Sequence, residues 1–265
     1  MSRGVFLATL HQRRKHLFWY ALGLVSYSWF MVWFWPQMGG ADYAAIVDAM
    51  PKELFALFGD AELSFASLGG FFQTEYLGLM WILIASSAVI GYAAKALAGE
   101  ISSGTMELEM SQPVSRTAFI SARIAVLFVY VAVVVVATFL PIQVFGPAYE
   151  IDLPVRTYVL LYGIGSLFLL SIGAVALLIS ALSKDGGRPV AVASALIAVM
   201  WMGDFLAQVS DVADALEPIN LLGYWKPGRL INDGTASGDW WWVYALVTVV
   251  ALAGSVVVFK RRDLA

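Results

Sequence analysis

The chain has 265 residues, of which 60% are hydrophobic and only 13% are charged, and its formal net charge is -3. A soluble domain usually carries about 25% charged residues, so this composition excludes an ordinary soluble domain and indicates a protein embedded in lipid. The chain contains no cysteine, which excludes disulfides, thiolate chemistry and cysteine-ligated metals.

Six apolar segments are long enough to cross a bilayer, because a hydrocarbon core of about 30 Å needs roughly 20 helical residues. The predicted spans cover residues 17–35, 76–94, 122–143, 157–183, 189–210 and 240–259. Pro141 and Pro147 indicate that the third helix ends early. The expected fold is one all-α polytopic transmembrane domain over residues 1–265, with outer loops at 36–75, 144–156 and 211–239.

Lysine and arginine are divided unevenly between the two sides of this predicted membrane. Twelve of the 16 lie at the termini and in the second and fourth loops, and four lie on the opposite side. The acidic residues do the reverse, with five on the first side and thirteen on the other. Because short cytoplasmic loops are enriched in lysine and arginine, both termini are predicted to be cytoplasmic.

Two segments outside the spans are unusually apolar. Before the first span, Val5, Phe6 and Leu10 precede Arg13 and Arg14, which predicts a short helix in the inner membrane interface, with a frayed tail as the alternative. The last outer segment, residues 211–239, is too apolar for a fully solvated loop. It fits either a re-entrant hairpin shielded by protein or water, or a folded outer cap.

Few residues in the spans could carry chemistry. Asp204 is the one carboxylate within a predicted span, and it marks a candidate intramembrane polar site. Its place in the outer third of the fifth span favours a hydrated or hydrogen-bonded acid over a proton-coupling or substrate site. His11 and His16 are the only histidines, and no Gly-Lys dipeptide occurs. We therefore predict neither a phosphate-binding loop nor a metal or catalytic site.

The cytoplasmic loop over residues 95–116 is the most patterned polar part of the chain. Gly104 lets the chain turn, residues 105–111 can form two helical turns, and Ser115 can cap the next helix. Met106 and Met110 are four residues apart and so share one helix face. A Met-lined helix with flanking acids suits a groove on another protein. The alternative, a helix lying on the headgroups, is disfavoured because the inner leaflet is negatively charged.

The same loop resembles a known family. Glu100, the run Gly104-Thr105-Met106-Glu107 and the run Gln112-Pro113-Val114-Ser115-Arg116 are similar to the loop of permease subunits in type-2 ABC exporters. The predicted six-span topology, the large first outer loop and the basic C-terminal end are similar to that family as well. Met106 stands where leucine is commoner, and Glu109 interrupts the usual apolar run.

The resemblance implies a non-catalytic permease subunit in the plasma membrane of a prokaryote. A separate cytoplasmic ABC ATPase subunit would bind ATP and Mg, so that this chain holds no cofactor, and a second permease subunit would pair with it as a homodimer rather than a heterodimer. No nucleic acid partner is implied. The residues that would couple the spans to the ATPase are Glu100, Gly104, Thr105, Met106, Glu107, Met110, Pro113 and Arg116.

The cargo follows only as a class. The spans offer aromatic, methionine and small polar side chains but no cluster of basic residues, which favours export of an amphipathic or hydrophobic substrate such as a drug, a peptide antibiotic or a lipid. A self-sufficient secondary transporter or channel that is not driven by ATP is the alternative function.

Overall fold

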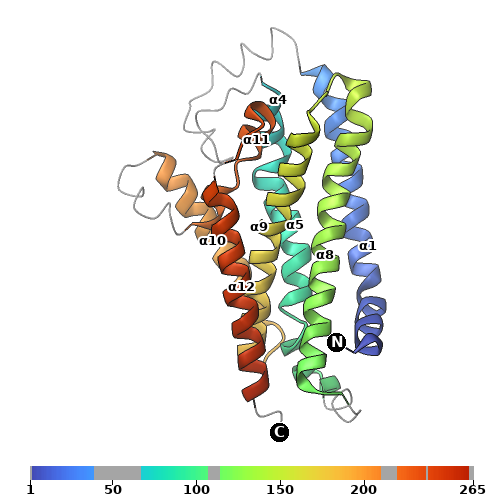
Figure 1. Ribbon diagram of the computed structural model, residues 1–265, viewed down its shortest axis with the longest axis vertical. Helices are drawn as coiled ribbons and strands as arrows, with labels where there is room; N and C mark the ends of the chain where they lie inside the picture. Colours follow the sequence, from blue (N-terminus) through green and yellow to red (C-terminus); the bar gives the residue numbers. More distant parts are fainter. Residues whose placement is uncertain (1, 39–66, 107–113, 210–219, 237, 263–265) are drawn as a thin grey trace.

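The computed structural model describes residues 2–38, 67–106, 114–209, 220–236 and 238–262. Within these ranges every regular element is a helix and no strand occurs, which confirms the predicted all-α class (Figure 1). Five of the helices in this part of the chain are long and apolar enough to cross a membrane. They are α1 (Arg3–Phe34), α8 (Arg116–Phe145), α9 (Val155–Leu182), α10 (Arg188–Val209) and α12 (Gly238–Arg261).

The predicted second span consists of a bent pair of helices. Helix α4 (Leu68–Phe72) continues through a π-helical turn (Gln73–Leu77) and bends by 45° at Gly78 into α5 (Leu79–Ala93). The pair counts as a sixth crossing segment if both parts form one span. The helix begins before the predicted residue 76 because Ser67 caps α4, where its hydroxyl accepts a hydrogen bond from the amide of Gly70 (3.0 Å).

Of two predictions about helix ends, the one for the N-terminal segment is wrong. Residues 2–38 contain no separate interfacial helix, because α1 runs without a break from Arg3 to Phe34 and buries Thr9 within the protein. Helix α8 ends at Phe145, close to the predicted end at residue 143 and before Pro147, although Pro141 itself lies inside the helix. Pro141 is buried among neighbouring helices, which tolerate the lost backbone hydrogen bond in a membrane span.

Helix α9 forms the centre of the bundle. Of its most apolar window, 72% is buried inside the protein, compared with 17% for α10 at the edge. Helix α12 packs along α9, and α1 packs along α8 (Figure 1). Helices α10 and α12 therefore present long apolar faces that the other described residues do not cover.

The two termini lie at the same end of the bundle (Figure 1). The start of α8 belongs to this end, because Arg116 donates hydrogen bonds to carbonyls at the end of α12. The short helix α6 (Ala98–Ser102) lies here too, since the amide of Ala98 donates to Ser180 near the end of α9. We call it the terminal end. The opposite end holds α4 and the short helix α11 (Pro227–Asp233), which pack against each other.

Candidate functional site

The polar loop after α5 is attached to the centre of the bundle. Its backbone amides at Leu97 and Ala98 both donate to the hydroxyl of Ser180 on α9, at 3.2 Å and 3.0 Å. This hydroxyl thus satisfies two amide groups at the start of α6 that have no partner within the helix. On its other side, α6 packs closely against the turn that follows α9. If Gly186 in this turn carried a Cβ atom, that atom would lie only 3.0 Å from the Cα atom of Gly99 in α6.

Glu100 on α6 forms a buried ion pair with Arg123 of α8. The guanidinium lies 2.7 Å from each carboxylate oxygen, and the two side chains are 9% and 1% exposed. Such a pair is costly to break, because removal of one partner leaves a charge in a low-dielectric interior. Glu100 therefore joins the loop to α8 and lies inside the protein in this structure.

Arg123 extends the connection to α1. Its guanidinium donates to the hydroxyl of Thr9 on α1 and lies over the ring of Phe119, with 4.6 Å between Cζ and the ring centroid. The hydroxyl of Tyr92, at the end of α5, donates to the backbone carbonyl of Arg123 at 2.7 Å. Helices α1, α5, α6 and α8 thus meet at one buried cation.

The chain turns after α6 through a glycine that the backbone requires. Gly104 has φ +74°, a left-handed conformation that residues with a side chain rarely adopt. Its amide donates to the carbonyl of Ile101 at 3.1 Å, and the Thr105 hydroxyl donates to the carbonyl of Glu100 at 3.3 Å. Beyond this turn Met106 is 3% exposed and packs into the chain's own core. The turn thus directs the Met106 side chain inward in this structure, and its coupling role stays a prediction.

Arg116 connects the far end of the loop to the C-terminal end of the chain. Its guanidinium donates to the carbonyls of Lys260 (3.2 Å) and Arg262 (2.5 Å). Arg262 in turn donates to the carbonyl of Ala181 on α9 at 2.6 Å. As predicted, Ser115 caps α8, where its hydroxyl accepts from the amide of Ala118 at 3.2 Å. Glu107, Met110 and Pro113, which the resemblance predicts to be coupling residues, lie outside the described residues.

Asp204 is paired rather than isolated. It is 7% exposed, lies 3.7 Å from the Lys226 ammonium, and accepts a hydrogen bond from Gln208 at 3.0 Å. Nearby, the side-chain amide of Asn220 donates to the carbonyl of Met200 at 2.7 Å. These contacts hold α10 against the segment that follows it, which fits the hydrogen-bonded acid favoured from the sequence. The described residues contain no group of three or more His, Asp or Glu side chains that could hold a metal ion.

The described part of the last outer segment folds back into the bundle. Trp225 is 1% exposed and stacks on Trp81 and Phe168, with ring centroids 4.6 Å and 5.6 Å away. Its indole N–H donates to the carbonyl of Leu77 at 2.7 Å, and the amide of Gly228 donates to the Gln73 side chain at 2.9 Å. Protein thus shields the backbone here, as a re-entrant segment requires.

Residues 43–265 match a protein family described as "Protein of unknown function (DUF2705)". The chain belongs to this family. The matched range contains Glu100, Arg123, Ser180 and Asp204, whereas Thr9 precedes it. None of the curated proteins matches the chain.

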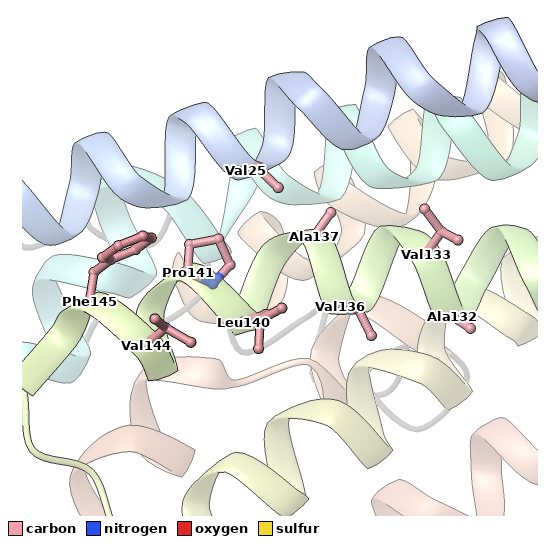
Figure 2. A pocket seen from close by; sticks show the side chains of 9 residues that line it. All are labelled: Val25, Ala132, Val133, Val136, Ala137, Leu140, Pro141, Val144 and Phe145. Carbon is pink, nitrogen blue, oxygen red and sulfur yellow. The ribbon is translucent and has the colours of Figure 1, made fainter.

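This DUF2705 protein also has an open apolar groove of about 560 Å³ along α8 (Figure 2). Val25 of α1 contributes to one side, and the remaining described lining comes from α8. The α8 residues are Ala132, Val133, Val136, Ala137, Leu140, Pro141, Val144 and Phe145. Such a lining offers dispersion contacts to an acyl chain or another hydrophobic body, but no charge and no side-chain hydrogen bond.

Sequence reasoning missed three residues that anchor the loop in this DUF2705 chain, namely Thr9, Arg123 and Ser180. A signal for Arg123 was present, because Arg116, Phe119 and Arg123 recur at spacings of three and four and so share one face of a helix. An arginine on that face needs a carboxylate once it is buried, but Glu100, Glu107 and Glu109 all precede it in the same loop, so the sequence did not single out Glu100 as the partner. Ser180 carried no comparable signal.

Proposed function

We propose that this chain is the membrane-spanning permease subunit of an ATP-binding-cassette exporter. In this proposal both termini and the 95–116 loop are cytoplasmic, in the plasma membrane of a prokaryote. A separate ATPase subunit binds ATP and Mg, and a second copy of the chain completes the translocation pathway. The charge asymmetry and the resemblance of the loop to type-2 ABC permeases support this assignment.

One structural observation carries the proposal, namely the buried ion pair between Glu100 and Arg123. A loop that merely connected two spans would need no ion pair with side chains 9% and 1% exposed. Here the pair ties α6 to α8, and Arg123 reaches α1 through Thr9. Ser180 ties the same loop to α9. A displacement of the loop would therefore be transmitted to three long helices.

The geometry divides the loop residues into two roles. Glu100 and Met106 are buried and hold the loop on the bundle. Ser103, Gly104 and Thr105 are exposed at the turn and are available to a partner protein. We assign contact with the ATPase subunit to this exposed turn and to the residues that follow it, and transmission of force to the buried pair.

The cargo is proposed as an amphipathic or hydrophobic molecule. The apolar groove along α8 supports this class, since its described lining offers apolar contacts only (Figure 2). A transporter driven by protons is the alternative, and it would use Asp204. The contacts of Asp204 with Lys226 and Gln208 favour a structural role for this carboxylate instead.

The proposal predicts that a neighbouring reading frame encodes the ATPase, and the test is ATP-dependent transport by the complex of the two proteins. Gly104→Pro cannot adopt φ +74° and loses the amide that donates to Ile101, so transport should be abolished while membrane insertion persists. Gly104→Asn is the matched control, because asparagine tolerates this conformation and should retain transport. Normal transport by the proline variant, or transport by the chain without any ATPase subunit, would contradict the proposal.

A further inference from the structure

Two grooves flank the C-terminal end of α9 at the terminal end of the bundle. One, of about 580 Å³, lies against the start of α10. The other, of about 450 Å³, lies against the end of α12. Leu182 and Lys184 line both grooves, so the two are neighbours that share one rim.

The polar lining of both grooves is mainly cationic. Lys184 and Arg188 line the first groove, and Lys184, Arg261 and Arg262 line the second. Asp185 is the single acid among the described lining residues, and its carboxylate already accepts a hydrogen bond from the amide of Gly187 at 2.7 Å. The site around Lys184 thus presents a positive charge to whatever fills the grooves.

An exposed apolar stripe leads away from each group of cations. On α10, Arg188 is followed at helical spacing by the exposed side chains of Val192, Leu196 and Val199. On α12, the exposed side chains of Trp242, Leu246, Val250 and Val257 lead to Arg261, which lies one turn beyond Val257. Residues four apart share a helix face, so each stripe has its cation at the terminal end.

We propose that this site binds an anionic glycerophospholipid. The phosphate would lie beside Lys184, Arg188 and Arg261, and the acyl chains would follow the stripes on α10 and α12. The arrangement matches such a lipid in both parts, since basic residues at the membrane boundary attract anionic headgroups and the stripes offer only apolar surface to the chains. A soluble phosphate would satisfy the cations but would leave the stripes without a role. The inference is independent of the proposed ATPase partner.

Binding can be measured by native mass spectrometry of the purified, delipidated full chain in a neutral detergent. The probes are phosphatidylglycerol, zwitterionic phosphatidylcholine with the same acyl chains, and soluble glycerol 3-phosphate. Lys184→Gln/Arg261→Gln removes two cations without altering the hydrogen bond from Arg262 to Ala181. Each basic residue near an anionic lipid contributes about 1 kcal/mol, so the double variant should bind phosphatidylglycerol roughly thirty-fold more weakly. The variant Lys184→Arg/Arg261→Lys keeps both positive charges and should bind phosphatidylglycerol as tightly as the native chain does. That result would show that the two positions tolerate substitution.

Two control variants separate this site from general surface charge. Lys260→Gln changes a neighbour of Arg261 in the sequence. Lys260 itself is not among the described residues that line either groove. Arg156→Gln removes an exposed cation at the other end of α9. Both should bind phosphatidylglycerol within two-fold of the native chain.

Several outcomes would overturn the proposal. These are equal binding of phosphatidylglycerol and phosphatidylcholine, tight binding of glycerol 3-phosphate alone, or an equal loss in the Lys260→Gln control. If the double variant lost binding of an ATPase subunit but retained phosphatidylglycerol, the basic site would be a protein contact and the lipid assignment would be wrong.

Discussion

The ion pair between Glu100 and Arg123 yields the sharpest prediction about stability. The charged atoms lie 2.7 Å apart, and the side chains are 9% and 1% exposed, so either single replacement strands a buried charge. Glu100→Leu and Arg123→Leu should each lower the free energy of unfolding by about 3–5 kcal/mol. The double variant removes both charges and should lose much less than the sum of the single variants.

The cost of the double variant can be bounded from the remaining contacts of Arg123. The loss of its contact with the Phe119 ring costs about 0.5–2 kcal/mol. Thr9 keeps a hydrogen bond to the carbonyl of Val5 (2.7 Å) after its arginine partner is removed, so its hydroxyl remains satisfied. The double variant should therefore lose about 1–2 kcal/mol, provided that the two leucines fill the vacated volume.

The assay is reversible unfolding in mixed micelles with increasing dodecyl sulfate, followed by tryptophan fluorescence. Arg156→Leu, an exposed arginine at the opposite end, is the control and should change the free energy by less than about 0.5 kcal/mol. Single variants within about 1 kcal/mol of the native chain, or a double variant equal to the sum of the two, would refute the buried coupling.

Three further predictions concern other contacts. Ser180→Ala removes the acceptor shared by the amides of Leu97 and Ala98 and should cost about 1–3 kcal/mol in the same unfolding assay, whereas Ser183→Ala, at the half-buried end of α9, removes a single hydrogen bond to the carbonyl of Ile179 and should cost less. Trp225→Ala should cost about 3–5 kcal/mol, because it empties a fully buried site between Trp81 and Phe168; a loss below about 1 kcal/mol would mean that the segment does not pack there. Asp204→Asn should retain transport with an unchanged pH profile, since the carboxylate is held by Lys226 and Gln208; a shift of the pH optimum would instead support a proton-coupling role.

Hydropathy predicted apolar segments of a length set by the thickness of a bilayer. Five of them are long, apolar helices, and the sixth is the bent pair that ends in α5. The ends were harder to predict. Pro141 did not terminate α8, because packing against neighbours outweighs the missing hydrogen bond. The bend at Gly78 also had no clear sequence signal, since glycine in a span is common.

The candidate site was predicted only in part, for a physical reason. Gly104 and Ser115 act locally, through a turn and a helix cap, and both follow from the sequence. The partners of Glu100 lie on other helices and depend on tertiary packing, which a single sequence does not specify. Met106 illustrates the same limit, because its apolar side chain suits a partner's groove and its own core equally well.

The absence of cysteine from the chain allows the central proposal to be tested by site-directed cross-linking. Ser103→Cys places one thiol on the exposed turn after α6, and Asp152→Cys places one at the opposite end as the control. A photo-activated maleimide cross-linker on each thiol is illuminated in native membranes, and the adducts are identified by mass spectrometry. We predict that the thiol at position 103, and not the one at position 152, captures a soluble ATPase that contains a Gly-Lys-Ser/Thr loop. Capture of no ATPase at position 103, or equal capture from both positions, would contradict the assignment of this loop as the joint between an ATPase and the membrane helices.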